Sequence, residues 1–142
     1  MKILAIDLGL KGAVAQLNGR ELMSARNLPL HNRLPCATTL EPLIKQCDIL
    51  AIESVSASPR ASGASAFILG SHFGAMALLA HLCGIKPLWV APTVWKAGLK
   101  LSASKSESLT RARGLWQDVE IQHDGQAEAA LLGLYAALHN RL

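Results

Sequence analysis

The chain has 142 residues, of which 51% are apolar, and its formal net charge at pH 7 is +4. This length and apolar content predict one domain, residues 1–142, with a sizeable core. The sequence shows no secretory pattern and no uninterrupted membrane-type run of about 18 apolar residues, so we expect a soluble cytoplasmic protein without a membrane partner. Cys36, Cys47 and Cys83 lack CxxC or metal-like spacing, which fits buried thiols in a reducing cytosol.

Hydrophobic patterns and turn residues predict strands and helices in the order strand, strand, strand, helix, strand, helix, strand, helices. The expected strands cover residues 2–7, 13–17, 22–28, 49–53 and 87–90. The expected helices cover residues 39–46, 62–83, 104–116 and 125–140, and residues 29–35 are expected to form a loop. Asn18-Gly19 predicts a hairpin, and Gly84 predicts the end of the long helix.

This order predicts an α/β fold of the RNase H-like type, with a mixed five-stranded sheet and helices on both faces. Three strands would form an antiparallel meander, and the later strands would run parallel to the first. Asp7 and Glu53 each end an apolar strand. Because interior parallel strands are apolar on both faces, a charge at the strand end is expected at the rim of the sheet.

Two further acids, Asp124 and Glu128, begin the last helix with i, i+4 spacing, which would place them on one helix face. An alternative is that Asp124 caps the helix and Glu128 is a solvated residue that stabilises its positive end. Four carboxylates at one rim would repel one another, so a shared cation is the interpretation that we favour. The site is therefore predicted to contain Asp7, Glu53, Asp124 and Glu128.

Carboxylate oxygens suit Mg²⁺ or Mn²⁺, and two such ions about 3.5 to 4 Å apart can activate water and stabilise a leaving oxygen. The acids therefore predict metal-assisted phosphodiester hydrolysis. Asp7 would bridge the ions, Glu53 would hold the ion on the leaving-group side, and the helix pair would hold the ion that activates water. A basic surface around this acidic pocket suits a polyanionic substrate.

Six segments, in this order and spacing, resemble the RuvC-like Holliday junction resolvases, particularly their compact phage and prophage members. They are Ala5-Ile6-Asp7-Leu8-Gly9, Ala51-Ile52-Glu53, Ser65-Ala66-Phe67-Ile68-Leu69-Gly70, Ala91-Pro92-Thr93-Val94-Trp95-Lys96, Ser104-Lys105-Ser106-Glu107-Ser108 and His123-Asp124-Gly125-Gln126-Ala127-Glu128-Ala129. The resemblance covers nearly the whole chain. It implies a homodimeric, metal-dependent endonuclease that binds four-way DNA and makes paired symmetric nicks in DNA recombination or repair.

The resemblance also gives roles to basic residues. Lys105 falls where the family carries a lysine near the scissile phosphate, and Lys96 lies in the segment that approaches DNA. Each lysine is also consistent with an ordinary solvated charge. Further candidate DNA contacts are Lys11, Lys100, Arg111 and Arg113, of which the last is equally consistent with a helix-surface charge.

One departure from the family pattern concerns the opening of the junction. Many members carry an aromatic wedge shortly after the second acid, but here the first aromatic residue after Glu53 is Phe67. The polar segment from Ser56 to Gly63 is expected to be a loop. Arg60 in this loop is a candidate contact to phosphate or to the junction centre, and a plain connection is an equal alternative.

Small residues in the long helix predict a close approach of a second helix, with a twofold copy of the chain as the expected partner. The candidate interface residues are Phe67, Gly70, Ser71, Gly74 and Ala75. Burial inside the monomer is the alternative. His72 and His81 lie on the same helix without a ligand-like partner and are expected to be packed or surface residues.

Two other classes of function fit parts of the sequence. Asp7-Leu8-Gly9 with Gly12 resembles the first phosphate loop of actin-like and sugar-kinase ATPases, but those need a second comparable domain. An RNase H-like nuclease that cuts RNA or an RNA–DNA hybrid would use similar acids. A non-catalytic branched-DNA-binding module is the third class, and the presence of all four acids argues against it.

Overall fold

The structure is a computed structural model and describes residues 1–54 and 62–140. Within these ranges the predicted strands and helices follow one another in the predicted order, and a short hairpin and one short helix are added to them. The strands are β1 (Lys2–Asp7), β2 (Ala13–Asn18), β3 (Glu21–Asn27), β4 (Leu30–His31), β5 (Leu34–Pro35), β6 (Ile49–Glu53) and β7 (Leu88–Val90). The helices are α1 (Ala37–Gln46), α2 (Gly63–Leu82), α3 (Pro92–Gly98), α4 (Lys105–Leu115) and α5 (Asp124–His139).

Five of the strands form one mixed sheet in the order β3-β2-β1-β6-β7. The first three strands form an antiparallel meander, and β6 and β7 run parallel to β1. Asn18 pairs with Glu21 across a two-residue turn that includes Gly19, whose positive φ of 58° suits a tight hairpin. The predicted α/β fold with an RNase H-like mixed sheet is therefore confirmed.

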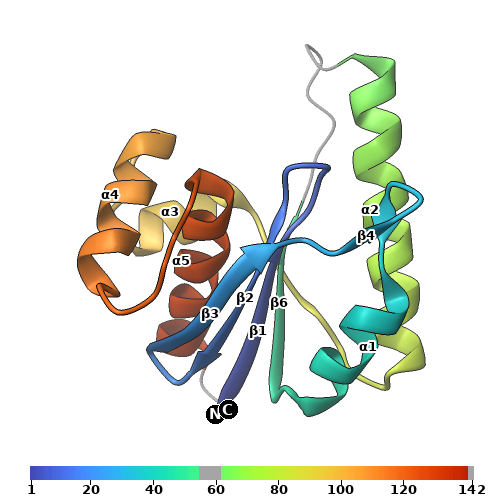
Figure 1. Cartoon of the computed structure of the whole chain (residues 1–142), viewed down its shortest axis with the longest axis horizontal. Coiled ribbons are helices and arrows are strands. Elements are labelled where there is room, and N and C mark those ends of the chain that lie inside the picture. Colours follow the sequence, from blue (N-terminus) through green and yellow to red (C-terminus); the bar gives the residue numbers. More distant parts are fainter. Residues whose placement is uncertain (55–61, 141–142) are drawn as a thin grey trace.

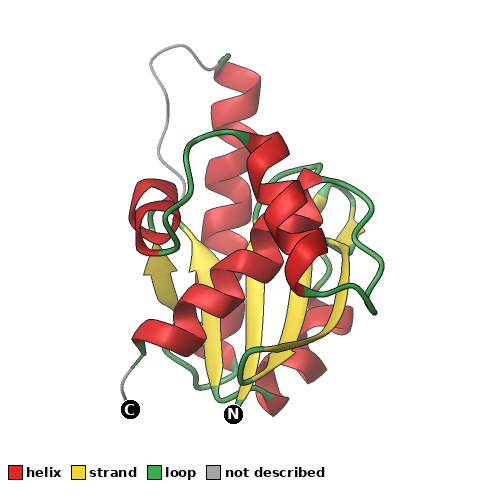
Figure 2. Cartoon of the chain, turned by 90° about the vertical axis from the view of Figure 1, so that its left-hand side faces the viewer, coloured by secondary structure: helices red, strands yellow, loops and turns green. Residues whose placement is uncertain are grey.

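Two apolar clusters cover the two faces of this sheet. Along β1, Ile3 and Ala5 belong to the cluster beneath α5, whereas Leu4 and Ile6 belong to the cluster beneath α1 and α2. Figure 1 shows α3, α4 and α5 on one side of the sheet and α1 and α2 on the other, and Figure 2 looks onto the α5 side. Burial on both faces explains why β1 and β6 are nearly continuous apolar runs.

Some details differ from the sequence predictions. Residues 29–35 were expected to be a loop, but Leu30–His31 and Leu34–Pro35 pair as a short antiparallel hairpin. Its two turn residues, Asn32 and Arg33, both have positive φ, as in a type I′ turn, and this pattern does not contain the usual glycine signal. The three cysteines were expected to be buried, but all are partly exposed.

The long helix α2 has two contrasting sides. His72, Met76, Leu79 and Ala80 are buried against the rest of the fold, while Phe67, Leu78 and Leu82 are 76%, 60% and 73% exposed. By length and composition alone α2 could cross a membrane, but one such helix is weak evidence, and its buried side packs into the globular fold. The outward apolar side is the feature that requires an explanation.

Candidate active site

The four predicted acids line one cleft at the edge where β1 and β6 end. Asp7 ends β1, Glu53 ends β6, and Asp124 and Glu128 lie in the first two turns of α5. The cleft has a volume of about 760 Å³ and is also lined by the loop from Leu8 to Gly12. Three elements that are distant in sequence therefore bring carboxylates to a single open depression.

The start of α5 is fixed by polar contacts to the end of β3. His123 is the N-cap residue, and its Nδ1 accepts a hydrogen bond from the Gly125 N–H at 3.1 Å. Asn27 accepts hydrogen bonds from the His123 ring and from the Gln126 side chain. Asp124 is thus the first residue of the helix, and the alternative that it is the cap is wrong.

Glu128 is not the solvated residue of the alternative interpretation, because it is only 8% exposed. Its Oε1 accepts a hydrogen bond from Lys96 Nζ at 2.7 Å. The neighbouring residue Trp95 is completely buried and donates its Nε1–H to Glu53 Oε2 at 2.8 Å. Two consecutive residues of the short helix α3 therefore hold the carboxylates of two different elements.

The loop after Asp7 is packed so closely that no side chain would fit at Gly12 within the loop or at Gly125 in the adjacent helix α5. Gly9 has a φ of +120°, which side-chain-bearing residues rarely adopt. A Cβ at Gly12 would lie 2.2 Å from the Asp7 carbonyl oxygen, and one at Gly125 would lie 2.9 Å from the Lys11 carbonyl oxygen. The loop is therefore closely packed between the end of β1 and the first turn of α5.

Burial and the neighbouring charges change the pKa of Asp7 and of Glu53. Burial, the largest cause, and the charges of Glu53, Glu128 and Asp124 together raise the pKa of Asp7 from 3.8 to about 8, while the charge of Lys105 acts in the opposite direction. The pKa of Glu53 is also raised, mainly by burial, although the Trp95 hydrogen bond acts in the opposite direction. Such crowding of like charges is expected where a cation normally neutralises the group.

The donor chemistry of this cleft fits a hard divalent cation, because carboxylate oxygens are the preferred ligands of Mg²⁺ and Mn²⁺. Within residues 1–54 and 62–140, however, no group of three His, Cys, Asp or Glu side chains is close enough to hold a metal ion as the side chains stand. Trp95 and Lys96 hold the Glu53 and Glu128 carboxylates in their present orientations. It is the donor chemistry of the cleft, and not its present side-chain spacing, that fits the cation.

Basic residues line the same cleft as the acids. Lys11, Lys96 and Lys105 line it, and Lys105 Nζ lies 3.8 Å from Asp124 Oδ2 while its side chain remains 74% exposed. Lys100 is exposed but does not line the cleft. Arg60 lies outside the described residues.

Two predicted arginines make structural contacts. Arg113 donates two hydrogen bonds from Nε and Nη2 to the Ile121 carbonyl oxygen, at 3.0 and 2.8 Å, and Arg111 donates to the Leu99 carbonyl oxygen at 3.3 Å. Arg113 therefore anchors the segment that leads into α5. Neither contact places an arginine in the cleft.

Comparison with solved structures places this fold beside RuvC. The chain superimposes on the RuvC protein of Thermus thermophilus, in a structure with its Holliday junction substrate, with a TM-score of 0.71 and 17% identity. The match covers 98% of this chain and 94% of that chain. A second structure of Thermus thermophilus RuvC gives a TM-score of 0.60 at 20% identity, over 97% and 96% of the two chains. No protein-family model and no curated protein matches the sequence.

These matches show a RuvC-like fold over nearly the full length of both chains. At such low identity the likeness concerns the fold, and the roles of the cleft residues depend on their own chemistry.

Three residues of the site were not assigned a role from the sequence, namely Asn27, Trp95 and His123. Asn27 ends β3, which is parallel to β1, so a polar residue at the end of the third strand was a usable signal for the same rim. Trp95 and His123 belong to the motifs that carried the family resemblance. A hydrogen bond between an indole and a distant carboxylate has no local sequence signal.

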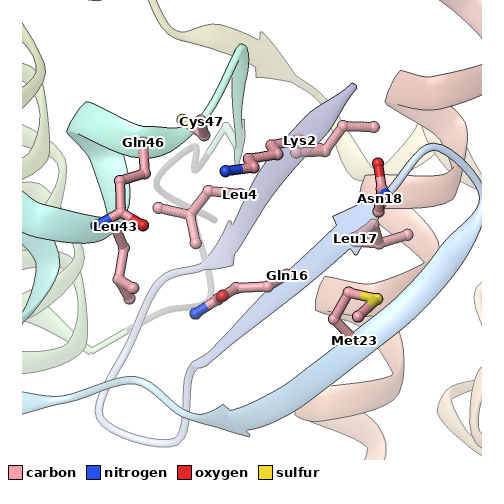
Figure 3. Close-up of a pocket in the computed structure, with 10 residues that line it drawn as sticks. Lys2, Leu4, Gln16, Leu17, Asn18, Met23, Leu43, Gln46 and Cys47 are labelled. Carbon is pink, nitrogen blue, oxygen red and sulfur yellow. The ribbon is translucent and has the colours of Figure 1, made fainter.

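A second hollow lies at the opposite ends of the strands, near the start of β1 and the end of α1 (Figure 3). Its volume is about 280 Å³, and Lys2, Gln16, Asn18 and Gln46 supply its main polar side chains. The residues that line it include no carboxylate. It therefore offers no counterpart to the acidic cleft.

Proposed function

We propose that the protein is a Mg²⁺- or Mn²⁺-dependent endonuclease that resolves four-way DNA junctions by paired symmetric nicks. The observation that carries the proposal is the convergence of Asp7, Glu53, Asp124 and Glu128 on one lysine-flanked cleft. A RuvC-like fold supports the choice of branched DNA, because the Thermus thermophilus protein was crystallised with a Holliday junction. The four acids support phosphodiester hydrolysis, and the choice of four-way DNA as the substrate rests on the structural similarity to RuvC.

The carboxylates of the cleft would hold two divalent ions, which supply a polarised water and charge stabilisation at the phosphate. Asp7 is the candidate to contact both ions because β1 is the central strand and its carboxylate interacts electrostatically with the other three. Glu53 would contribute from the β6 side, and Asp124 with Glu128 from the α5 side. Trp95 would keep the Glu53 carboxylate oriented.

The lysines would handle the negative charge of the DNA. Lys105 is exposed beside Asp124, so its ammonium group would be accessible to a DNA phosphate. Lys96 is 13% exposed and bonded to Glu128, so it would lie nearer the reacting phosphate. Further candidate DNA contacts are Lys11, which also lines the cleft, Lys100 and Arg60.

The active form would be a homodimer, since paired nicks in opposing strands require two active sites. The predicted interface residues Phe67, Gly70 and Gly74 are exposed on the outward side of α2, and Ser71 and Ala75 are half-buried there. Added Cβ atoms at Gly70 and Gly74 would meet nothing within 4 Å, so a partner helix could approach closely.

We propose that the protein acts in the cytoplasm of a bacterial or phage-infected cell, as a compact phage-type enzyme of one domain.

The test is cleavage of a labelled four-way DNA junction, with linear duplex DNA and an RNA–DNA hybrid as comparison substrates. The wild-type protein and Asp7→Asn are assayed with Mg²⁺, with Mn²⁺ and with EDTA. We expect symmetric nicks in the junction that disappear in EDTA and in Asp7→Asn. Junction binding should persist in Asp7→Asn, because the lysines remain.

Other outcomes would replace the proposal. Cleavage of the hybrid alone would identify an RNA-processing nuclease. Tight junction binding without any cut under both metals would identify a non-catalytic binding module.

A further inference from the structure

We propose that His72 is a positioning residue that fixes the loop from Leu8 to Gly12, and through this loop the proposed metal ligand Asp7 before it and the first turn of α5 beside it. His72 lies on α2 and is completely buried. Its Nδ1 accepts a hydrogen bond from the Gly9 N–H at 3.2 Å, and its Nε2 lies 2.7 Å from the Arg33 carbonyl oxygen. One side chain thus joins three segments that are far apart in sequence. The inference rests on the proposed metal chemistry of the cleft and adds a residue that does not line it.

The two contacts fix the proton on the imidazole ring. The Gly9 amide can only donate, so Nδ1 must be the acceptor, and the Arg33 carbonyl can only accept, so Nε2 must carry the hydrogen. This is the neutral ring in a single tautomer. Both ring nitrogens are therefore satisfied by main-chain groups, and neither is free to act as a metal ligand or as a base.

The Gly9 amide belongs to the loop that connects Asp7 to the cleft. At a φ of +120° the backbone of Gly9 has conformational alternatives that most residues lack, so its amide direction requires a partner to define it. On its other side the loop touches α5, where only a glycine at position 125 leaves room for the Lys11 carbonyl. His72 therefore binds, from α2, a loop that packs on its other side against α5, the helix that carries Asp124 and Glu128.

The second contact, to the Arg33 carbonyl oxygen, holds the imidazole ring from its other side. Arg33 has a φ of +65° and closes the β4–β5 hairpin beside α2. A non-glycine residue in this conformation is strained and persists where other contacts define it. The hydrogen bond from Nε2 to the Arg33 carbonyl holds the imidazole between the hairpin and the loop, so that the ring cannot turn away from Gly9.

The two bonds can be separated by a matched pair of substitutions. Asn places a carboxamide oxygen where Nδ1 lies, so His72→Asn keeps an acceptor for Gly9 and loses the bond to Arg33. Gln reaches one bond farther, so His72→Gln keeps a donor for Arg33 and loses the acceptor for Gly9. Each variant loses one hydrogen bond, and a merely structural role for His72 would affect both variants alike.

Two measurements read the effect on the full-length protein. Amide hydrogen exchange at Gly9, followed by NMR without metal, reports the bond itself. Calorimetric titration with Mn²⁺ reports the arrangement of the acids. For His72→Gln we expect exchange at Gly9 at least about tenfold faster and Mn²⁺ binding about tenfold weaker, the effect expected when a support of a ligand is lost. For His72→Asn we expect both values to stay within about twofold of the wild type.

Equal loss of Mn²⁺ affinity in both variants would overturn the proposal, as would unchanged affinity in His72→Gln. Failure of the proposed function is a separate result, in which the wild type binds Mn²⁺ but cuts no junction. The hydrogen-exchange and calorimetric comparisons keep their meaning in that case, because neither depends on cleavage.

Discussion

At the scale of single residues, the cleft combines acids that repel one another with two donors from α3 that restrain them. Trp95 donates to Glu53, and Lys96 donates to Glu128. The Lys96 ammonium also lies 5.3 Å from the centre of the Trp95 ring, within reach of a cation–π contact. Hydrogen bonds to charged groups stabilise more than neutral ones, so these two neighbours set the carboxylate orientations before any metal binds.

Replacement of Trp95 by Phe should weaken metal binding without unfolding the protein. The phenyl ring keeps most of the buried apolar volume but cannot donate to Glu53, which then loses its orientation. We expect the Mg²⁺ concentration for half-maximal junction cleavage to rise by roughly tenfold. Trp116→Phe is the matched control, because it removes the indole bond to the Arg20 carbonyl, which is not in the cleft. Equal Mg²⁺ dependence of the two variants would contradict the role of Trp95.

The raised pKa of Asp7 predicts how the stability of the metal-free protein depends on pH. Its value is about 8 in the folded state and 3.8 for an ordinary aspartate, so between these values the folded chain holds a proton that the unfolded chain has released. Stability from this group is complete below pH 3.8 and is lost as the pH rises toward 8, by at most about 1.4 kcal/mol per pH unit.

Asp7→Asn removes this dependence. In EDTA, the melting temperature of the variant should match that of the wild type near pH 4 and exceed it by at least roughly 5 °C near pH 8. Differential scanning calorimetry over this pH range measures the difference. Parallel pH profiles for the two proteins would show that the carboxylate is not held in a proton-binding environment.

At the scale of elements, α5 must pack closely on the sheet to bring Asp124 and Glu128 to the strand ends. Gly133 permits this approach, because a Cβ there would lie 2.3 Å from Leu17 Cδ1 and 3.3 Å from the Ala5 Cβ. Both neighbours are buried in the cluster beneath α5, so neither can move freely. The position of the acids in the cleft therefore depends on a glycine two turns away.

Gly133→Ala should destabilise the protein although alanine favours helices. Overpacking of a well-filled core costs about 1 to 3 kcal/mol, which exceeds the helix preference of about 0.5 to 1 kcal/mol. Gly114→Ala in α4 is the control, since a Cβ there would meet nothing within 4 Å and should stabilise the protein slightly. Urea unfolding of both variants measures the two changes. A gain in stability for Gly133→Ala would show that α5 can move away from the sheet at little cost.

The sequence predicted the helices and strands best where a regular pattern of apolar residues, or a glycine at a turn, marked them. Apolar strands, the end of α2 at Gly84 and the acids at strand ends were all recognisable from local patterns. The β4–β5 hairpin was missed because its turn contains Asn32 and Arg33 in place of glycine. The bonds of Trp95 and His72 could not be predicted, because they join residues 42 and 63 positions apart and depend on the packed fold.

At the scale of the whole molecule, the acidic cleft and the apolar side of α2 are separate features. Phe67 and Leu78 project on the outward side of α2, while His72 and Met76 project inward. Residues three or four apart share a side of a helix, so Phe67, Gly70, Gly74 and Leu78 form one outward stripe. If two copies pair through this stripe, each keeps its own cleft free for one DNA strand.

Leu78→Glu should therefore convert a dimer to a monomer. The leucine is 60% exposed in the single chain, so glutamate costs the monomer little, but a dimer that pairs through this stripe would bury a carboxylate from each chain. Size-exclusion chromatography with light scattering should give twice the chain mass of 15.1 kDa for the wild type and the single mass for the variant.

Met23→Glu is the control, because Met23 is similarly exposed at 58% but lies on the edge strand β3. We expect Met23→Glu to remain dimeric and to make paired nicks, and Leu78→Glu to lose the pairing of the two nicks. A wild-type protein that is monomeric at all concentrations, or a Leu78→Glu variant that remains dimeric, would mean that α2 is not the interface.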